Sequence, residues 1–137
     1  FYLSDVGMFT HQSGLNYERF LIDKDNALSG IYYENYIATE LVARRYPLFY
    51  WKGKRSSEFE FIMNIDNSIV AIDAKRGKSN LNSLEEFRSH NKTDLVIKVS
   101  SNQYGYNEAQ KLLTLPFYFF SFYLNSLESN SKSDEQN

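Results

Sequence analysis

Asp73 and Lys75 are the residues of this chain whose types and spacing best suit chemistry. They end the segment SIVAIDAK at residues 68–75, whose apolar and β-branched residues predict a strand. Side chains two residues apart share one face of a strand, so the carboxylate and the ammonium point the same way. Such a pair can serve a metal-dependent hydrolytic site, provided that other carboxylates lie close to it.

The strand before this one supplies a second carboxylate, Glu60. Its segment, EFEFIMNI at residues 58–65, alternates between apolar and other residues, and Asp66-Asn67 is a hairpin turn signal. The two strands are therefore expected to be neighbours, and one register puts Glu60 beside Asp73 and Lys75. The alternation predicts one face with Phe59, Phe61, Met63 and Ile65, and the opposite face with Glu58 and Glu60.

A third carboxylate, Glu34, comes from a helix expected at residues 30–45. Glu34 lies on the same stripe of that helix as the apolar residues Ile31, Ala38 and Leu41. A charged side chain on a buried stripe is costly unless something compensates its charge. Glu34 is therefore the helix carboxylate that we expect to face the sheet.

Three carboxylates and one lysine that meet on a sheet favour phosphodiester hydrolysis. Carboxylate oxygens are the ligands that Mg²⁺ prefers, usually with water and a substrate phosphate completing the shell. In this hypothesis Glu34, Glu60 and Asp73 hold Mg²⁺ or Mn²⁺, and Lys75 positions the attacking water and offsets charge on the phosphate. The plain alternative is a buried ion pair between Glu34 and Lys75.

The elements that must position these residues predict an α/β fold, with a mixed central sheet flanked by helices. Residues 101–115 give no clear pattern beyond a turn near Gly105. A final helix is expected to begin at Pro116 and to run to about Leu127. The other expected elements are helices at residues 5–10, 30–45 and 84–90 and strands at 48–52, 58–65, 68–75 and 94–100.

Composition supports one folded domain. The chain has 137 residues, 42% of them hydrophobic and 17% aromatic, which suits a packed core. We expect a single domain at residues 1–127 and a disordered tail at 128–137, where polar residues dominate. Absence of cysteine excludes disulfides and thiolate metal sites and fits a cytoplasmic protein. The most apolar run, residues 115–124, is half the length of a membrane span, so no membrane partner is expected.

The order of these elements, with an acid on the helix, an acid on the second strand and D-x-K on the third, resembles the PD-(D/E)xK nuclease superfamily. More specifically, the chain resembles the C-terminal domain of unknown function 4143 (DUF4143), found behind an AAA-type ATPase module in many bacterial and archaeal proteins. The segments that carry the resemblance are FYLSDVG (1–7), GIYYEN (30–35), ATEL (38–41), YW (50–51), EFEF (58–61) and IDAK (72–75).

The resemblance implies a restriction-endonuclease-like core in a piece of a longer protein. ATP would bind only in the N-terminal module of that protein, since this chain has no Walker-type phosphate loop. The sequence departs from the family pattern at two positions. Glu60 stands where Asp is usual, and Asp73 stands where Glu is more frequent. We hypothesise that the two changes compensate, because they exchange one methylene between the two ligands.

Basic residues close to these carboxylates suggest contact with a phosphate backbone. The net charge of −2 offers no global attraction to nucleic acid, so any binding depends on a local patch. A solvated surface is the default interpretation of these residues, and Tyr50 and Trp51 beside them could stack on bases or lie in the core. The candidate contacts are Arg44, Arg45, Lys52, Lys54, Arg55, Arg76 and Lys78.

Two functions remain open from the sequence. The first is a Mg²⁺- or Mn²⁺-dependent endonuclease that acts on DNA. The second is a catalytically degenerate nuclease-fold module that binds nucleic acid or protein and regulates the attached ATPase. The oligomeric state, the DNA form and the biological pathway do not follow from the sequence.

Overall fold

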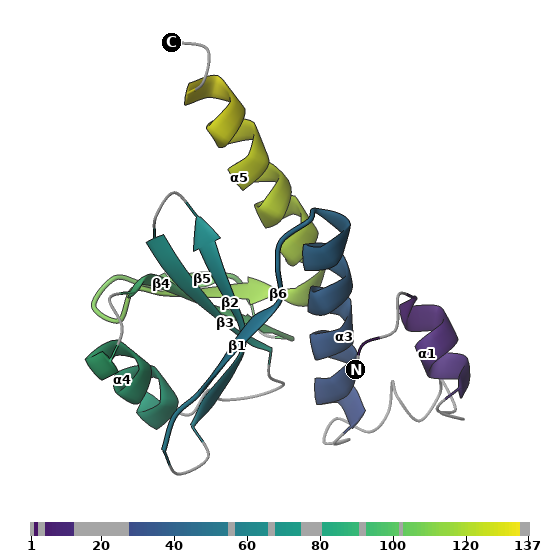
Figure 1. Cartoon of the computed structure of the whole chain (residues 1–137), viewed down its shortest axis with the longest axis horizontal. Coiled ribbons are helices and arrows are strands. Elements are labelled where there is room, and N and C mark those ends of the chain that lie inside the picture. Colours follow the sequence, from purple (N-terminus) through teal and green to yellow (C-terminus); the bar gives the residue numbers. More distant parts are fainter. Residues whose placement is uncertain are drawn as a thin grey trace.

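The computed structural model describes residues 2, 5–12, 28–54, 57–65, 68–74, 81–90, 93–101 and 103–134 (Figure 1). The predicted helices and strands up to residue 100 begin and end within three residues of the expected positions. The elements are α1 (Val6–Gln12), α3 (Leu28–Ala43), β1 (Phe49–Lys52), β2 (Glu58–Ile65), β3 (Ser68–Ala74), α4 (Leu81–His90), β4 (Thr93–Ser100), β5 (Gly105–Asn107), β6 (Leu112–Pro116), a 3₁₀ turn at Phe117–Phe119 and α5 (Phe120–Asp134).

The strands form one mixed sheet in the order β1-β2-β3-β4-β6-β5. Strands β1, β2 and β3 are an antiparallel meander, and α4 then carries the chain across to β4, which lies parallel to β3. Strand β6 is parallel to β4, while the short β5 is antiparallel to β6 at the far edge. The predicted α/β class, with a mixed central sheet flanked by helices, is confirmed.

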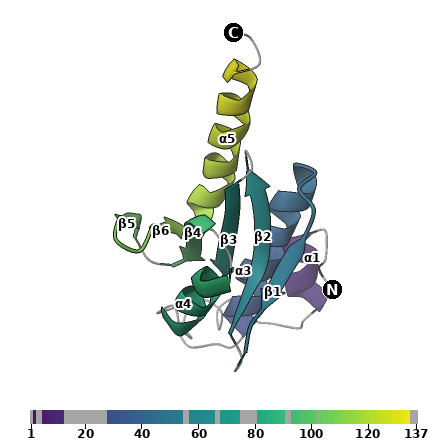
Figure 2. The same ribbon diagram turned by 60° about the vertical axis from the view of Figure 1, so that its left-hand side comes forward.

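Helices cover both faces of the sheet (Figures 1 and 2). One face packs against α3 and α5 in a large apolar cluster, here called the α3-side cluster, which includes Leu41, Phe61, Ile72, Ile97 and Phe120. The other face packs against α4 in a smaller one, the α4-side cluster, which contains Phe59, Ala71, Leu84, Phe87 and Val96. Because successive side chains of a strand point to opposite faces, these clusters show which way each strand residue points.

Two stretches near the C-terminus differ from the expected structure. Residues 101–115, which gave no clear pattern, contain β5 and most of β6, and these strands extend the sheet beyond β4. Helix α5 runs to Asp134 instead of ending near Leu127, so part of the predicted tail is helical.

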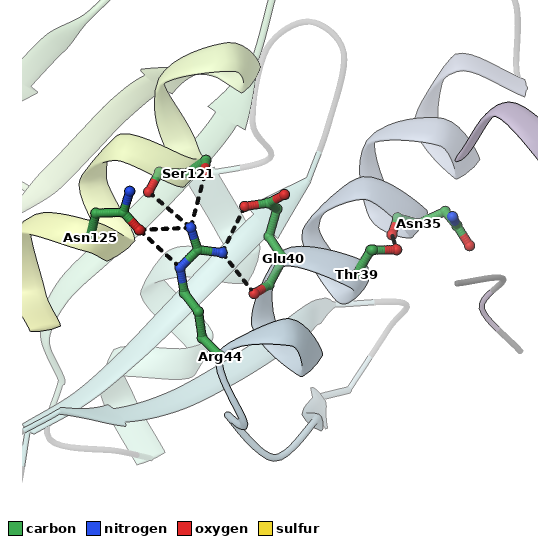
Figure 3. A network of polar contacts seen from close by, with 6 residues as sticks. All are labelled: Asn35, Thr39, Glu40, Arg44, Ser121 and Asn125. Carbon is green, nitrogen blue, oxygen red and sulfur yellow. Dashed lines mark hydrogen bonds and ion pairs between the residues drawn. The ribbon is translucent and has the colours of Figure 1, made fainter. Parts of the chain in front are cut away.

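Arg44 connects the end of α3 to α5 (Figure 3). Its guanidinium donates hydrogen bonds to the Glu40 carboxylate at 2.8 Å, to the Ser121 hydroxyl at 2.9 Å and to the Asn125 side-chain oxygen at 2.7 Å. A planar guanidinium with five N–H donors can serve several acceptors at once. Arg44 thus has a structural role between the two helices that cover the larger core.

Gly53 is expected to resist substitution, because a methyl group there has no room. A Cβ at Gly53 would lie 2.3 Å from Trp51 Cη2 and 2.8 Å from a carboxylate oxygen of Glu86. Trp51 is wedged against other rings, so we expect Gly53→Ala to destabilise the domain by about 1–3 kcal/mol in urea denaturation. Gly30→Ala is the control, since nothing lies within 4 Å of its Cβ position, and it should stabilise α3 by about 0.5 kcal/mol. Equal stabilities of the two variants would contradict this account.

Candidate functional site

A cavity of about 340 Å³ lies where α3 meets the β1–β2 edge of the sheet. Glu34 from α3 and Glu60 from β2, which are far apart in the sequence, both line it. Glu34 thus lies on the side of α3 that faces the β1–β2 edge. The described residues that line it are Tyr2, Glu34, Leu48, Phe49, Tyr50, Glu58, Phe59, Glu60 and Phe61.

A β-bulge positions Glu60. Phe49 pairs with Ile62, but Trp51 pairs with Phe59, so two residues of β2 lie opposite the single residue Tyr50 of β1. A bulge of this kind changes the alternation and re-aims a side chain. Here the two opposing residues are Glu60 and Phe61, and both line the cavity.

The bulge also corrects the predicted faces of β2. The alternation placed Phe59 on one face with Phe61 and Met63. Instead, Phe59 belongs to the α4-side cluster, whereas Phe61 and Met63 belong to the α3-side cluster. Because the bulge sets two residues of β2 against one of β1, Phe59 and Phe61 point to opposite faces although they are two residues apart. Counting alternate residues along the sequence does not detect such a bulge.

The carboxylate of Glu60 is held at the end of β3. One of its oxygens, Oε2, accepts a hydrogen bond of 3.3 Å from the backbone amide of Ala74. Ala74 directly follows Asp73, so Glu60 reaches the end of β3 next to Asp73.

Asp73 is buried next to a lysine that the sequence did not single out. Its neighbours Ile72 and Ala74 both point into the α3-side cluster, so Asp73 points toward α4. In β4, Lys98 is the partner of Asp73 in the register, and its neighbours Ile97 and Val99 also belong to the α3-side cluster. Asp73 and Lys98 therefore share the α4 face, with only 6% and 5% of their surfaces exposed.

Sequence reasoning missed Lys98 because it stands alone in the apolar segment DLVIKVS. The available signal was its type, since a lysine inside a buried strand needs a compensating charge. That Asp73 is the partner of Lys98 could not be predicted without the register between β3 and β4, which the crossover through α4 sets. The structure thus brings Glu34 and Glu60 together in the cavity and places Asp73 on the adjacent strand, beside Lys98.

The carboxylates of the cavity suit a divalent cation that takes only one or two ligands from the protein and completes its shell with water. Glutamate oxygens are ligands of Mg²⁺, which commonly keeps several waters and uses one or two carboxylates. Within the described part of the chain, no three His, Asp or Glu side chains are grouped closely enough to hold a metal ion. Glu34 and Glu60 fit as two such ligands, and the set of Glu34, Glu60 and Asp73 stays a prediction. Lys75 lies outside the described residues.

The pKa of Tyr2 responds to the negative charge of the cavity. Burial raises the pKa of its phenol above the ordinary value, and the carboxylates of Glu34 and then Glu60 raise it further. Because its pKa is higher in the folded state than in the unfolded state, the associated stability is present below pH 10 and is lost as the pH rises through the raised value.

Glu34→Gln should therefore lower the pKa of Tyr2, because it removes the carboxylate that has the larger of the two electrostatic effects on this phenol. The ¹³C resonances of labelled tyrosine, followed in an alkaline titration, measure this directly. Tyr123 is an internal control, since its pKa is raised by burial and then by Tyr104, without either glutamate. A Tyr2 titration that is the same in the wild type and in Glu34→Gln would show that the two groups are not close.

The predicted nucleic-acid contacts have different environments. Arg44 is engaged between α3 and α5, whereas Arg45, Lys52 and Lys54 are exposed. Trp51 packs edge-on against Phe87, with ring centroids 5.1 Å apart, and belongs to the core. Tyr50 is 75% exposed beside the cavity and is open to stacking. Arg55, Arg76 and Lys78 lie outside the described residues.

The fold and the cavity define the class: an α/β domain in which a helix and the second strand of a meander bring carboxylates into one cavity. Residues 29–118 match the family described as Domain of unknown function (DUF4143). The match covers more than half of the chain, so the chain belongs to this family. No curated protein and no solved structure matches the chain significantly. Among the described helices, none is both long and apolar enough to cross a membrane.

Proposed function

We propose that this chain is a nuclease-like domain of the PD-(D/E)xK type that hydrolyses phosphodiester bonds of DNA with a divalent cation. The observation that carries the proposal is that Glu34 of α3 and Glu60 of β2 line one cavity, with Glu60 bonded to the amide that follows Asp73. The order of helix, three antiparallel strands, helix and parallel strand supports the same class.

In this proposal Glu34 and Glu60 hold Mg²⁺ or Mn²⁺, with Asp73 at the end of β3 as the third carboxylate. The cation would supply positive charge against the phosphate. Glu60 is kept in place by the Ala74 amide, and Lys75 orients the attacking water. Exposed Lys52 and Lys54 lie on and just after β1, where they can contact the phosphate backbone.

A second candidate is favoured by the position of Asp73. Asp73 is the register partner of Lys98 on the α4 face, and both residues are buried. A carboxylate that shares a buried face with a lysine is a weaker ligand for a cation. We propose, as the alternative, a catalytically degenerate module that regulates an attached AAA-type ATPase by binding nucleic acid or protein. In this case Asp73 is structural, and Lys75→Ala would leave the ATPase activity of the full-length protein unchanged.

Cleavage assays separate the two candidates. Purified protein is incubated with Mn²⁺ and supercoiled, single-stranded or branched DNA, beside Glu60→Gln, Lys75→Ala and the matched control Glu85→Gln on the exposed side of α4. The nuclease proposal expects cutting by the wild type and by Glu85→Gln, and a loss of about 100-fold or more in the other two variants. Cutting that survives both substitutions comes from a contaminant, and absence of cutting on every substrate favours the degenerate module.

A further inference from the structure

The cavity at the β1–β2 edge is lined by side chains that a divalent cation would not contact. Five of its nine described lining residues are aromatic. Its volume of about 340 Å³ is in the range of pockets that take small organic groups. Tyr2 and Phe61 are in ring contact, with centroids 5.7 Å apart, and they form one side of the cavity. Phe49 and Tyr50 remain 58% and 75% exposed on the other strand.

The described lining of the cavity carries negative charge. Among the lining residues that the structure describes, three are glutamates and none is basic. Glu34 and Glu60 are partly buried, whereas Glu58 is exposed and faces Lys52 across the β1–β2 pair.

Aromatic faces beside carboxylates select organic cations. Ring faces of Tyr and Phe attract a cation within about 6 Å of the centroid, and carboxylates supply the opposite charge. A guanidinium suits both, because it is planar, stacks on rings and donates in a fork that matches carboxylate oxygens. An ammonium is more strongly hydrated and lacks the planar face.

We propose that this cavity binds a guanidinium group, supplied by the arginine side chain of a peptide or by a free guanidinium compound. The group would stack on the aromatic wall of Tyr2 and Phe61 and donate hydrogen bonds to Glu34 and Glu60. This binding would be a function separate from the proposed hydrolysis of DNA. It would occupy the carboxylates that the proposed divalent cation needs, so the two ligands exclude each other.

Calorimetric titration without metal, in the presence of EDTA, tests the proposal. The probes are the capped tripeptide Gly-Arg-Gly, the same peptide with citrulline or lysine in place of arginine, and free ethylguanidinium. We expect saturable binding of the arginine peptide and affinities at least about tenfold lower for the citrulline and lysine peptides. Ethylguanidinium affinity close to that of the peptide identifies the free compound as sufficient, and much weaker binding identifies the peptide.

Variants of the cavity complete the test. Glu34→Gln should weaken binding of the arginine peptide about tenfold or more, while Glu85→Gln, on α4, should have no effect. Tyr50→Ala is a second variant that keeps the fold, because this side chain is largely exposed, and it too should weaken binding.

Equal affinity for the arginine and citrulline peptides, no effect of Glu34→Gln or no saturation up to about 10 mM peptide overturns the proposal. Because no metal is present, such a failure is distinct from failure of the nuclease proposal.

Discussion

Asp73→Ala is expected to lower the free energy of unfolding by about 3–5 kcal/mol, which is a large fraction of the stability of a domain of this size. Asp73 and Lys98 are register partners on the α4 face, and both are almost fully buried. Removal of the carboxylate leaves Lys98 buried on the face of the sheet that holds Ala71 and Val96, without the charge of its register partner. Urea denaturation followed by circular dichroism measures the loss.

A double-mutant cycle shows whether the effect belongs to this pair. Asp73→Ala combined with Lys98→Met should recover most of the stability, because the long apolar side chain fills the space without a charge. A loss below about 1 kcal/mol in Asp73→Ala, or a double variant no more stable than the single variant, would show that the two groups do not depend on each other. Coupling of about 2 kcal/mol or more would support a structural role of Asp73.

Phe87→Ala should have an effect of similar size, about 3–5 kcal/mol. Phe87 is 1% exposed on α4 and packs edge-on against Trp51 and Phe59, with ring centroids 5.1 and 5.0 Å away. The substitution removes the ring that joins α4 to the sheet and leaves a cavity beneath Trp51. Denaturation measures the cost, and the fluorescence of Trp51, the single tryptophan, should shift to longer wavelength as water enters.

Phe122→Ala is the matched control for that substitution. The ring of Phe122 is 68% exposed on α5, so its removal should change stability by about 0.5 kcal/mol or less. Phe87→Ala as mild as this control would mean that α4 is not held to the sheet through the aromatic contact.

The order of the core elements could be predicted because their patterns are long and regular. Strands β2 and β3 alternate or are continuously apolar, and the turn signal between them fixes an antiparallel pair. Strand β5 has only three residues, two of them exposed, so it carries little pattern. The turn before β6 contains Lys111 with φ of 41°, a conformation that residue type alone does not suggest.

The site could be predicted in part. Glu34 followed from the cost of a charge on a buried stripe, and it does line the cavity with Glu60. The direction of Glu60 could not be predicted, because strand parity was counted through the bulge opposite Tyr50. Nothing in the local sequence of β2 marks that bulge. The register partner of Lys98 could not be predicted, since it depends on the alignment of β3 with β4 across the α4 crossover.

Binding of Mn²⁺ tests most directly that Glu34 and Glu60 form a cation site. Electron paramagnetic resonance follows free Mn²⁺ during titration of the wild type, Glu60→Gln and the control Glu85→Gln. We predict one bound Mn²⁺ with a Kd of about 1 mM or lower in the wild type and the control, and at least tenfold weaker binding in Glu60→Gln. Equal affinity in all three proteins, or no binding up to about 10 mM Mn²⁺, would contradict the account.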